Sequence, residues 1–175
     1  FINHEYIQKL RLASTLHDIG KVGIPDEILL KPGRLAEKER KIMQQHAVIG
    51  SRCLREIRDR LENDGFLAMA YNIAIGHHEH WDGNGYPYGV SGVEIPFEAR
   101  VVAIADVYDA LRSQRVYKDS MSHEQASLII RQGSGTQFDP ELVGVFERCS
   151  EEFKAQSQHA SQEPEICLLE RIREC

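Results

Sequence analysis

Apolar residues recur every three to four positions along most of the chain, a spacing typical of one face of an α-helix. The pattern predicts an all-α protein. Helices are expected over residues 5–17, 26–30, 36–59, 66–80, 97–113, 122–132 and 140–154. The clearest of them is 36–59, where a single stripe contains Ile42, His46, Ile49, Cys53 and Ile57.

Capping residues and glycines mark several ends of these helices. Ser122 opens a Ser-x-x-Gln sequence, which has the spacing of a capping box. Asp139 stands directly before a proline and is expected to cap the helix that follows, and Asp26 is interpreted as a cap in the same way. Residues 82–95 are too rich in glycine for a regular element, so they predict a shaped loop.

The length of 175 residues suits one domain with a tail. Residues 1–154 are assigned to the domain and 155–175 to the tail. The tail is interpreted as a polar linker over 155–164, followed by a short amphipathic helix over 165–174. We expect this helix to pack on the domain, with pairing to a second copy as a homodimer as the alternative.

Charge and composition narrow the classes of partner. Lys and Arg total 21 and Asp and Glu total 27, so the formal charge at pH 7 is −6. This balance argues against polymeric nucleic acid as a ligand, while a small phosphate compound stays compatible with locally gathered cations. No apolar run approaches the ~20 residues of a membrane span, and the four cysteines form no Cys-x-x-Cys pair. We therefore expect a cytoplasmic protein, or the cytoplasmic part of a longer membrane-attached one.

Histidine and aspartate recur at the inner ends of the predicted helices. A buried carboxylate is costly unless it is paired or bound to a metal ion. Imidazole and carboxylate together suit iron, manganese, nickel or zinc. Each residue alone is more often an ordinary core or surface residue, and spacing does not show that they converge. The candidate ligands are His17, Asp18, His46, His77, His78 and Asp106.

Longer motifs surround these residues. The chain contains LHDIGKVGIPDEILLKPG at 16–33, HHEHWDGNGYPYGVSGVEIP at 77–96, ADVYDAL at 105–111 and RVYK at 115–118. In this order they closely resemble the HD-GYP subgroup of the HD phosphohydrolase superfamily. The resemblance implies an HD-domain helical bundle with a glycine-rich GYP loop and a C-terminal helical tail.

The resemblance also implies an activity. HD-GYP proteins are bacterial phosphodiesterases that open cyclic di-GMP to linear pGpG, and often on to GMP, with two or three divalent metal ions. Iron or manganese is expected, and nickel or zinc suits the same ligands. A metal-bridging hydroxide is expected to attack the phosphodiester in line. The six candidate ligands match the family's metal-binding positions, and Asp18 would bridge two ions.

Further roles follow from the same motifs. Lys21, beside the bridging Asp18, is expected to contact the phosphate or polarise the leaving oxygen. Arg115 and Lys118 are expected to hold the substrate phosphates, and Tyr86 of the GYP loop is also expected to bind the substrate. The resemblance also links this loop to docking of diguanylate cyclase domains, and it implies a sensor or receiver domain upstream.

One departure from the family pattern concerns the first helix. Further family ligands lie upstream of the His-Asp pair, and only 16 residues precede His17 here. The natural protein is therefore expected to be longer. Two alternatives stay open: a catalytically silent module that binds cyclic dinucleotides or docks proteins, and a phosphohydrolase that acts on another nucleotide.

Overall fold

The regular structure is helical throughout the part of the chain that the computed structural model describes, residues 2–61, 65–113 and 121–160, apart from one isolated bridge between Ser134 and Phe138. This confirms the all-α prediction. The α-helices are α1 (His4–Ser14), α2 (Asp26–Leu29), α3 (Glu37–Met43), α4 (Gln45–Arg58), α5 (Gly65–Gly76), α6 (Phe97–Arg112), α7 (His123–Gln132), α8 (Pro140–Arg148) and α9 (Ser150–Ala160). Two 3₁₀ turns, η1 (Ile19–Gly23) and η2 (Gly92–Glu94), lie between them.

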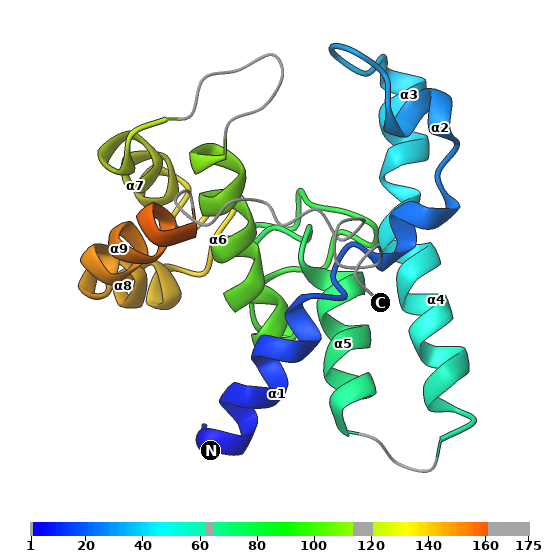
Figure 1. Ribbon diagram of the computed structural model, residues 1–175, viewed down its shortest axis with the longest axis horizontal. Coiled ribbons are helices and arrows are strands. Elements are labelled where there is room, and N and C mark those ends of the chain that lie inside the picture. Colours follow the sequence, from blue (N-terminus) through cyan, green and yellow to red (C-terminus); the bar gives the residue numbers. More distant parts are fainter. Residues whose placement is uncertain (1, 62–64, 114–120, 161–175) are drawn as a thin grey trace, which may run out of the picture.

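Helix α6 stands between two groups of helices (Figure 1) and contributes to two hydrophobic cores. Val102 packs with residues of α1, α4 and α5, such as Ile73, in the first core. Ile104 and Tyr108 pack with residues of α7 and α8, such as Phe146, in the second. Because one helix is shared by both cores, the position of α6 against α5 is held from two sides.

The predicted helix 36–59 is two helices, α3 and α4, which meet at Gln44. At this break, Nδ1 of His46 lies 2.7 Å from the carbonyl oxygen of Met43. A side chain that bonds to a carbonyl of the preceding turn competes with the backbone for it and bends a helix. The expected stripe is also wrong at both of its ends, because Ile42, Cys53 and Ile57 are exposed. The buried face of α4 contains His46, Ala47, Gly50, Ser51 and Leu54.

Two other helix ends differ from the prediction for tertiary reasons. Helix α5 ends at Gly76 instead of residue 80, since the next residues bond to the glycine-rich loop. The helix predicted to run to residue 154 breaks at Cys149. The rings of Phe146 and Phe153 are 5.0 Å apart across this break, whereas seven residues of straight helix rise about 10.5 Å.

Part of the predicted polar linker is helical. Residues 155–160 of the predicted linker belong to α9, which packs Phe153 against Tyr108 of the second core. The predicted helix 165–174 lies outside the described residues, so the domain boundary at 154 stays a prediction. The capping box of Ser122 and the cap at Asp139 are confirmed. Asp26 is the first residue of α2 and not its cap, which is Pro25.

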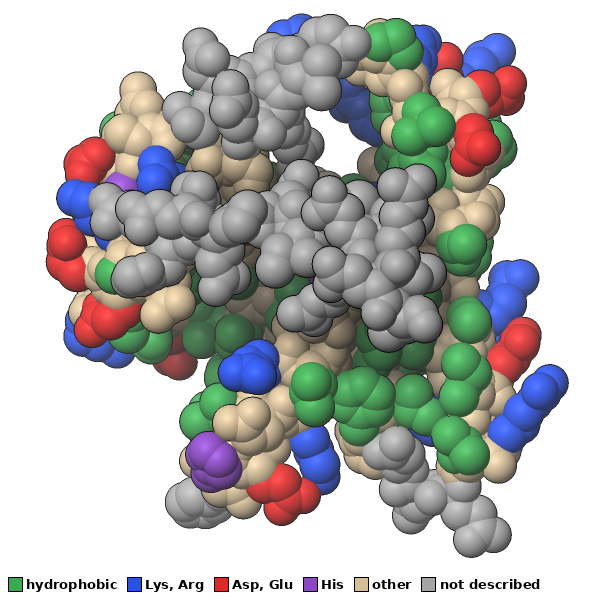
Figure 2. All heavy atoms as spheres, viewed as in Figure 1, with side chains coloured by type: hydrophobic (Ala, Val, Ile, Leu, Met, Phe, Trp, Pro, Cys, Tyr) green, Lys and Arg blue, Asp and Glu red, His purple; other side chains and the backbone are tan. Residues whose placement is uncertain are grey.

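Acidic and basic side chains lie interspersed around the periphery of the face shown in Figure 2. None of the helices among the described residues is long and apolar enough to cross a bilayer.

The turn η1 packs directly on α4 through two glycines. A Cβ placed on Gly20 would lie 1.9 Å from the carbonyl oxygen of His46 and 2.5 Å from the amide nitrogen of Gly50. No side chain fits at this distance, so the two backbones touch. The contact brings the residues just before η1 next to the first turn of α4.

Gly20→Ala is expected to lower the free energy of unfolding by about 1–3 kcal/mol, because the added methyl group forces the two backbones apart. Urea denaturation of the purified chain measures the loss. Gly144→Ala in α8 is the matched control, since the nearest heavy atom to its Cβ is 3.8 Å away, on Arg148. There we expect a gain of up to about 1 kcal/mol from helix propensity. Equal behaviour of the two variants would contradict the packing argument.

Candidate metal centre

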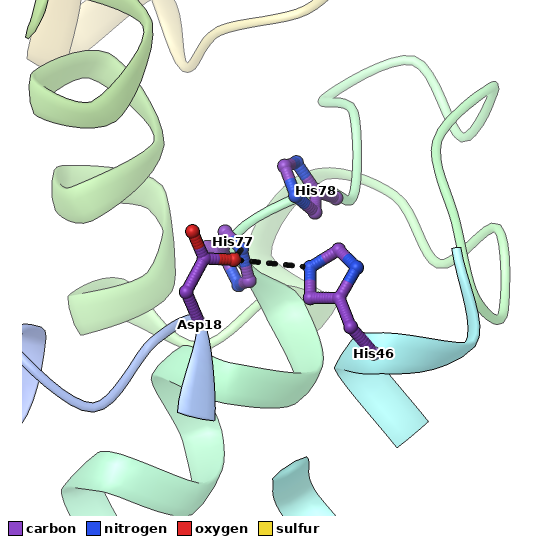
Figure 3. A group of neighbouring side chains, drawn as sticks. All are labelled: Asp18, His46, His77 and His78. Atoms are coloured by element: carbon purple, nitrogen blue, oxygen red, sulfur yellow. Dashed lines mark ion pairs between the residues drawn. The ribbon is translucent and has the colours of Figure 1, made fainter. Parts of the chain in front are cut away.

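All six candidate ligands predicted from the sequence converge on one place. His17 and Asp18 follow α1, His46 lies in the first turn of α4, and His77 and His78 follow α5. Asp106 lies on α6. Figure 3 shows Asp18, His46, His77 and His78 pointing toward one another from three separate segments. Their ligand atoms all lie within 4.8 Å of one another, a spacing that suits a shared metal ion.

Asp18 is at the middle of the cluster. Its Oδ1 lies 3.3 Å from Nε2 of His46 and 4.0 Å from Nε2 of His77. Its other oxygen, Oδ2, lies 3.2 Å from Nε2 of His17 and bonds to Nζ of Lys21. The two carboxylate oxygens therefore face different partners, which is the arrangement that a bridging carboxylate needs.

Asp106 joins the cluster through His17. Oδ1 of Asp106 lies 3.7 Å from Nε2 of His17, and the ring of His17 stands edge-on to His77 with centroids 5.2 Å apart. His17, Asp18 and Asp106 thus form a second group of potential ligands that shares Asp18 with the first. Two adjoining groups are compatible with more than one ion.

Local backbone contacts orient three of the four imidazoles. Nδ1 of His17 lies 2.7 Å from the carbonyl oxygen of Ser14, and Nδ1 of His77 lies 2.9 Å from that of Ile73. His46 makes the equivalent contact with Met43. A carbonyl only accepts, so each Nδ1 donates its hydrogen. In His46 and His77 this leaves Nε2 as the free lone pair that a metal ion binds, whereas Nε2 of His17 faces Oδ2 of Asp18.

Three buried atoms in the cluster have no hydrogen-bond partner among the described residues: Asp18 Oδ1, His46 Nε2 and His77 Nε2. Buried polar atoms are almost always paired, so three unpaired atoms that face one another call for an explanation. All three are lone-pair donors of the kind that divalent metal ions bind. The residues present therefore fit a metal ion.

The ionisation states suit the same interpretation. Burial lowers the pKa of His77 to about 4 and that of His78 to about 2, and it lowers the pKa of His46 as well. These imidazoles are neutral at pH 7, which is the form that binds metals. Burial alone would raise the pKa of Asp18, but hydrogen bonds from His17 and Lys21 hold it far below its usual range. Asp18 is therefore ionised.

The structure describes two of the four candidate substrate-binding residues, Lys21 and Tyr86. The side chain of Lys21 is about two-fifths exposed at the edge of the cluster, where it pairs with Asp18. The ring of Tyr86 stacks on His78 at 4.7 Å between centroids. Burial beside Asp18 and Asp106 raises the pKa of the Tyr86 hydroxyl, so it stays protonated. Arg115 and Lys118 lie outside the described residues.

Two polar contacts near the centre were not predicted from the sequence. Glu79 is buried and accepts hydrogen bonds from the backbone N–H groups of Tyr88 and Gly89. Arg100 pairs with Asp139 at 2.6 Å. The acid directly after the His-His pair was a signal for Glu79, whereas nothing local in the sequence connects Arg100 to a residue 39 positions away.

A model of the HD domain family matches residues 2–142. The chain belongs to the HD domain family. It is 49% identical over 154 residues to a cyclic di-GMP phosphodiesterase of Vibrio cholerae. This alignment covers 88% of the chain and 31% of that protein. It is 44% identical over 146 residues to 3'3'-cGAMP-specific phosphodiesterase 2 of the same species, with 83% and 27% covered. The resemblance to HD-GYP phosphodiesterases is thereby confirmed, and the chain spans less than a third of these relatives.

A solved structure of similar fold is the cyclic GMP-AMP-specific phosphodiesterase V-cGAP3 of Vibrio cholerae. The TM-score is 0.60 at 21% sequence identity, and the match covers 93% of this chain and 44% of that chain. At this identity the match supports the helical fold alone. It agrees with the predicted HD-domain bundle.

Mn²⁺ is expected to stabilise the chain, since a ligand that binds only the folded state raises its stability. At a hundredfold excess over the dissociation constant the gain is ~2.7 kcal/mol. Thermal unfolding of chelator-treated protein, with and without Mn²⁺, measures it. Asp18→Asn should abolish the gain, whereas Asp26→Asn, at an exposed acid of α2, should keep it. The same Mn²⁺ response in both variants would contradict a metal site at Asp18.

Proposed function

We propose that this chain is the metal-dependent phosphodiesterase domain of a bacterial signalling protein, and that it hydrolyses cyclic di-GMP to pGpG, GMP or both. The observation that supports this most directly is the set of three unpaired buried atoms on Asp18, His46 and His77. Such a cluster is costly for the folded protein and useful only with a cation in place. The names of the relatives supply the substrate class.

The ligand roles assigned to the six residues belong to this proposal. His46, His77 and His78 would bind one ion with Asp18, and His17 and Asp106 would bind a second. Divalent ions in such a site activate water and offset negative charge on a phosphate. The metal is proposed to be iron or manganese, in two or three ions.

Side chains of the protein would bind the substrate and offset its negative charge. Lys21 holds Asp18 ionised and presents an ammonium group at the edge of the cluster, where it would neutralise charge that develops on a phosphate. The hydroxyl of Tyr86 stays protonated and can donate a hydrogen bond. Arg115 and Lys118 are proposed to hold the substrate phosphates, and the planar guanidinium suits two-point contact.

The partners and setting follow the same proposal. The chain would act in the cytoplasm behind a sensor or receiver domain of the full protein, and its glycine-rich loop would dock diguanylate cyclase domains. A silent binding module is a weaker explanation, because every ligand position of the motifs that the chain covers is filled and these side chains converge.

A second candidate substrate is 3'3'-cGAMP. It is favoured by the relative that is named for this substrate and is 44% identical to the chain. Both compounds present the same phosphodiester ring and differ in one base, so the metal cluster by itself does not separate them.

Anaerobic loading with Fe²⁺, and separately with Mn²⁺, is expected to yield a protein that converts cyclic di-GMP to pGpG or GMP, resolved by chromatography. His17→Ala/Asp18→Ala should lower the rate at least a hundredfold, because it removes the shared carboxylate and a ligand of the proposed second ion. The matched control is His4→Ala/Glu5→Ala, which removes an exposed histidine and acid from α1 and should leave the rate unchanged. Parallel reactions with 3'3'-cGAMP rank the two substrates.

The natural full-length protein is assayed beside the 175-residue chain. Product from the longer protein alone would place further ligands outside this chain and keep the proposal. Metal bound in both proteins with no product from either cyclic dinucleotide would refute it in favour of a binding module.

A further inference from the structure

His78 differs from the other imidazoles of the centre. His17, His46 and His77 each hold Nδ1 against a backbone carbonyl, and these contacts set the direction of Nε2. No hydrogen bond of this kind holds His78 within the residues that the structure describes. A ligand without such a contact is free to rotate about its side-chain bonds unless packing restrains it.

The ring of Tyr86 supplies that restraint. It lies nearly parallel to the imidazole of His78, at 28° with centroids 4.7 Å apart, and His46 stands edge-on to the same imidazole at 5.0 Å. The ring centroid of His77 lies 3.9 Å from that of His78. His46 and His77 are proposed ligands themselves, so Tyr86 is the only one of these three rings that comes from the glycine-rich loop.

Backbone contacts hold the loop that contains Tyr86 against residues 78–80. The N–H of Tyr86 donates to the carbonyl of His78 at 3.1 Å. A Cβ on Gly85 would lie 2.2 Å from the amide nitrogen of His80 and 2.5 Å from Cα of Glu79, so the two segments touch without side chains between them. Tyr86 is thus held over His78 by its own backbone and by the position of the loop.

Glu79 binds the loop at the second and third residues after Tyr86. Its two oxygens accept separate hydrogen bonds, Oε1 from the N–H of Tyr88 at 2.7 Å and Oε2 from the N–H of Gly89 at 3.0 Å. The residue is 3% exposed. Buried carboxylates are rare, and charge-assisted hydrogen bonds to backbone N–H groups are about twice as strong as neutral ones. The carboxylate therefore acts as a two-point clamp.

We propose that Glu79 is a positioning residue: it fixes the glycine-rich loop so that the ring of Tyr86 orients His78 for metal binding. This rests on the proposed function, in which His78 is a metal ligand. In this arrangement stacking by Tyr86 fixes the orientation of the His78 ring, as contacts with backbone carbonyls fix the other three imidazoles. Glu79 acts through Tyr86 and touches neither metal nor substrate.

Glu79→Gln tests the clamp with the smallest change of shape. The amide keeps one accepting oxygen, but its NH₂ group faces an N–H donor, so one of the two hydrogen bonds is lost. Co²⁺ binding by the 175-residue chain, followed by visible absorption, is expected to weaken about tenfold. Glu94→Gln, an exposed acid in the same loop, is the matched control and should bind Co²⁺ as the unmodified chain does.

Trp81, the single tryptophan of the protein, reports on the loop itself. Acrylamide quenching of its fluorescence should rise in Glu79→Gln. A purely structural role of Glu79 would change the quenching and leave the Co²⁺ dissociation constant unchanged. That combination would overturn the proposal.

Tyr86→Ala provides the second test. It should weaken Co²⁺ binding to a similar extent, and the double variant with Glu79→Gln should be no weaker than Tyr86→Ala alone, because both changes remove the same restraint. Additive losses would contradict a path through Tyr86. Failure of the unmodified chain to bind Co²⁺ would refute the proposed metal centre, whereas normal binding by all variants would refute only the role of Glu79.

Discussion

The contact between the backbones of Gly20 and the first turns of α4 is the constraint on which the candidate centre depends. Asp18 lies two residues before Gly20, and His46 lies on the turn that Gly20 touches. Any side chain at Gly20 would keep the two segments apart, and Asp18 Oδ1 would no longer lie 3.3 Å from His46. The distance between Asp18 and His46 therefore depends on the absence of a side chain at Gly20.

The centre gathers groups that are costly to bury, and the fold limits that cost. Imidazoles are neutral at pH 7 when burial lowers their pKa, as it does for His46, His77 and His78. Asp18 stays ionised because hydrogen bonds from His17 and Lys21 stabilise its carboxylate. The remaining lone pairs face inward with no partner in the described structure, and this is what distinguishes a cation site from a satisfied polar core.

Helix α6 connects the centre to the rest of the molecule. Val102 packs in the core of α1, α4 and α5, while Tyr108 packs in the core of α7, α8 and α9. Asp106 lies between these two positions on the same helix and faces His17. A shift of α6 would disturb both cores, so Asp106 is held at its place in the cluster by packing on each side of it.

Much of this was readable in the sequence, because several interactions are local. The helices, the cap at Asp139 and the carbonyl contacts of three imidazoles join residues no more than four positions apart. The candidate ligands were found by residue type and motif. Helix ends at Gly76 and Cys149 were misplaced, since hydrogen bonds from the loop and the packing of Phe153 override local propensity there.

The all-α class, the HD-GYP motifs and the chemistry of the candidate ligands were predictable from the sequence. That six side chains from separate segments meet, that Glu79 bonds to the loop and that Arg100 reaches Asp139 became visible in the folded chain. The reason is physical. Local patterns set the conformation of each segment, whereas distances between segments depend on which backbones can touch and which charges are left to pair in the core.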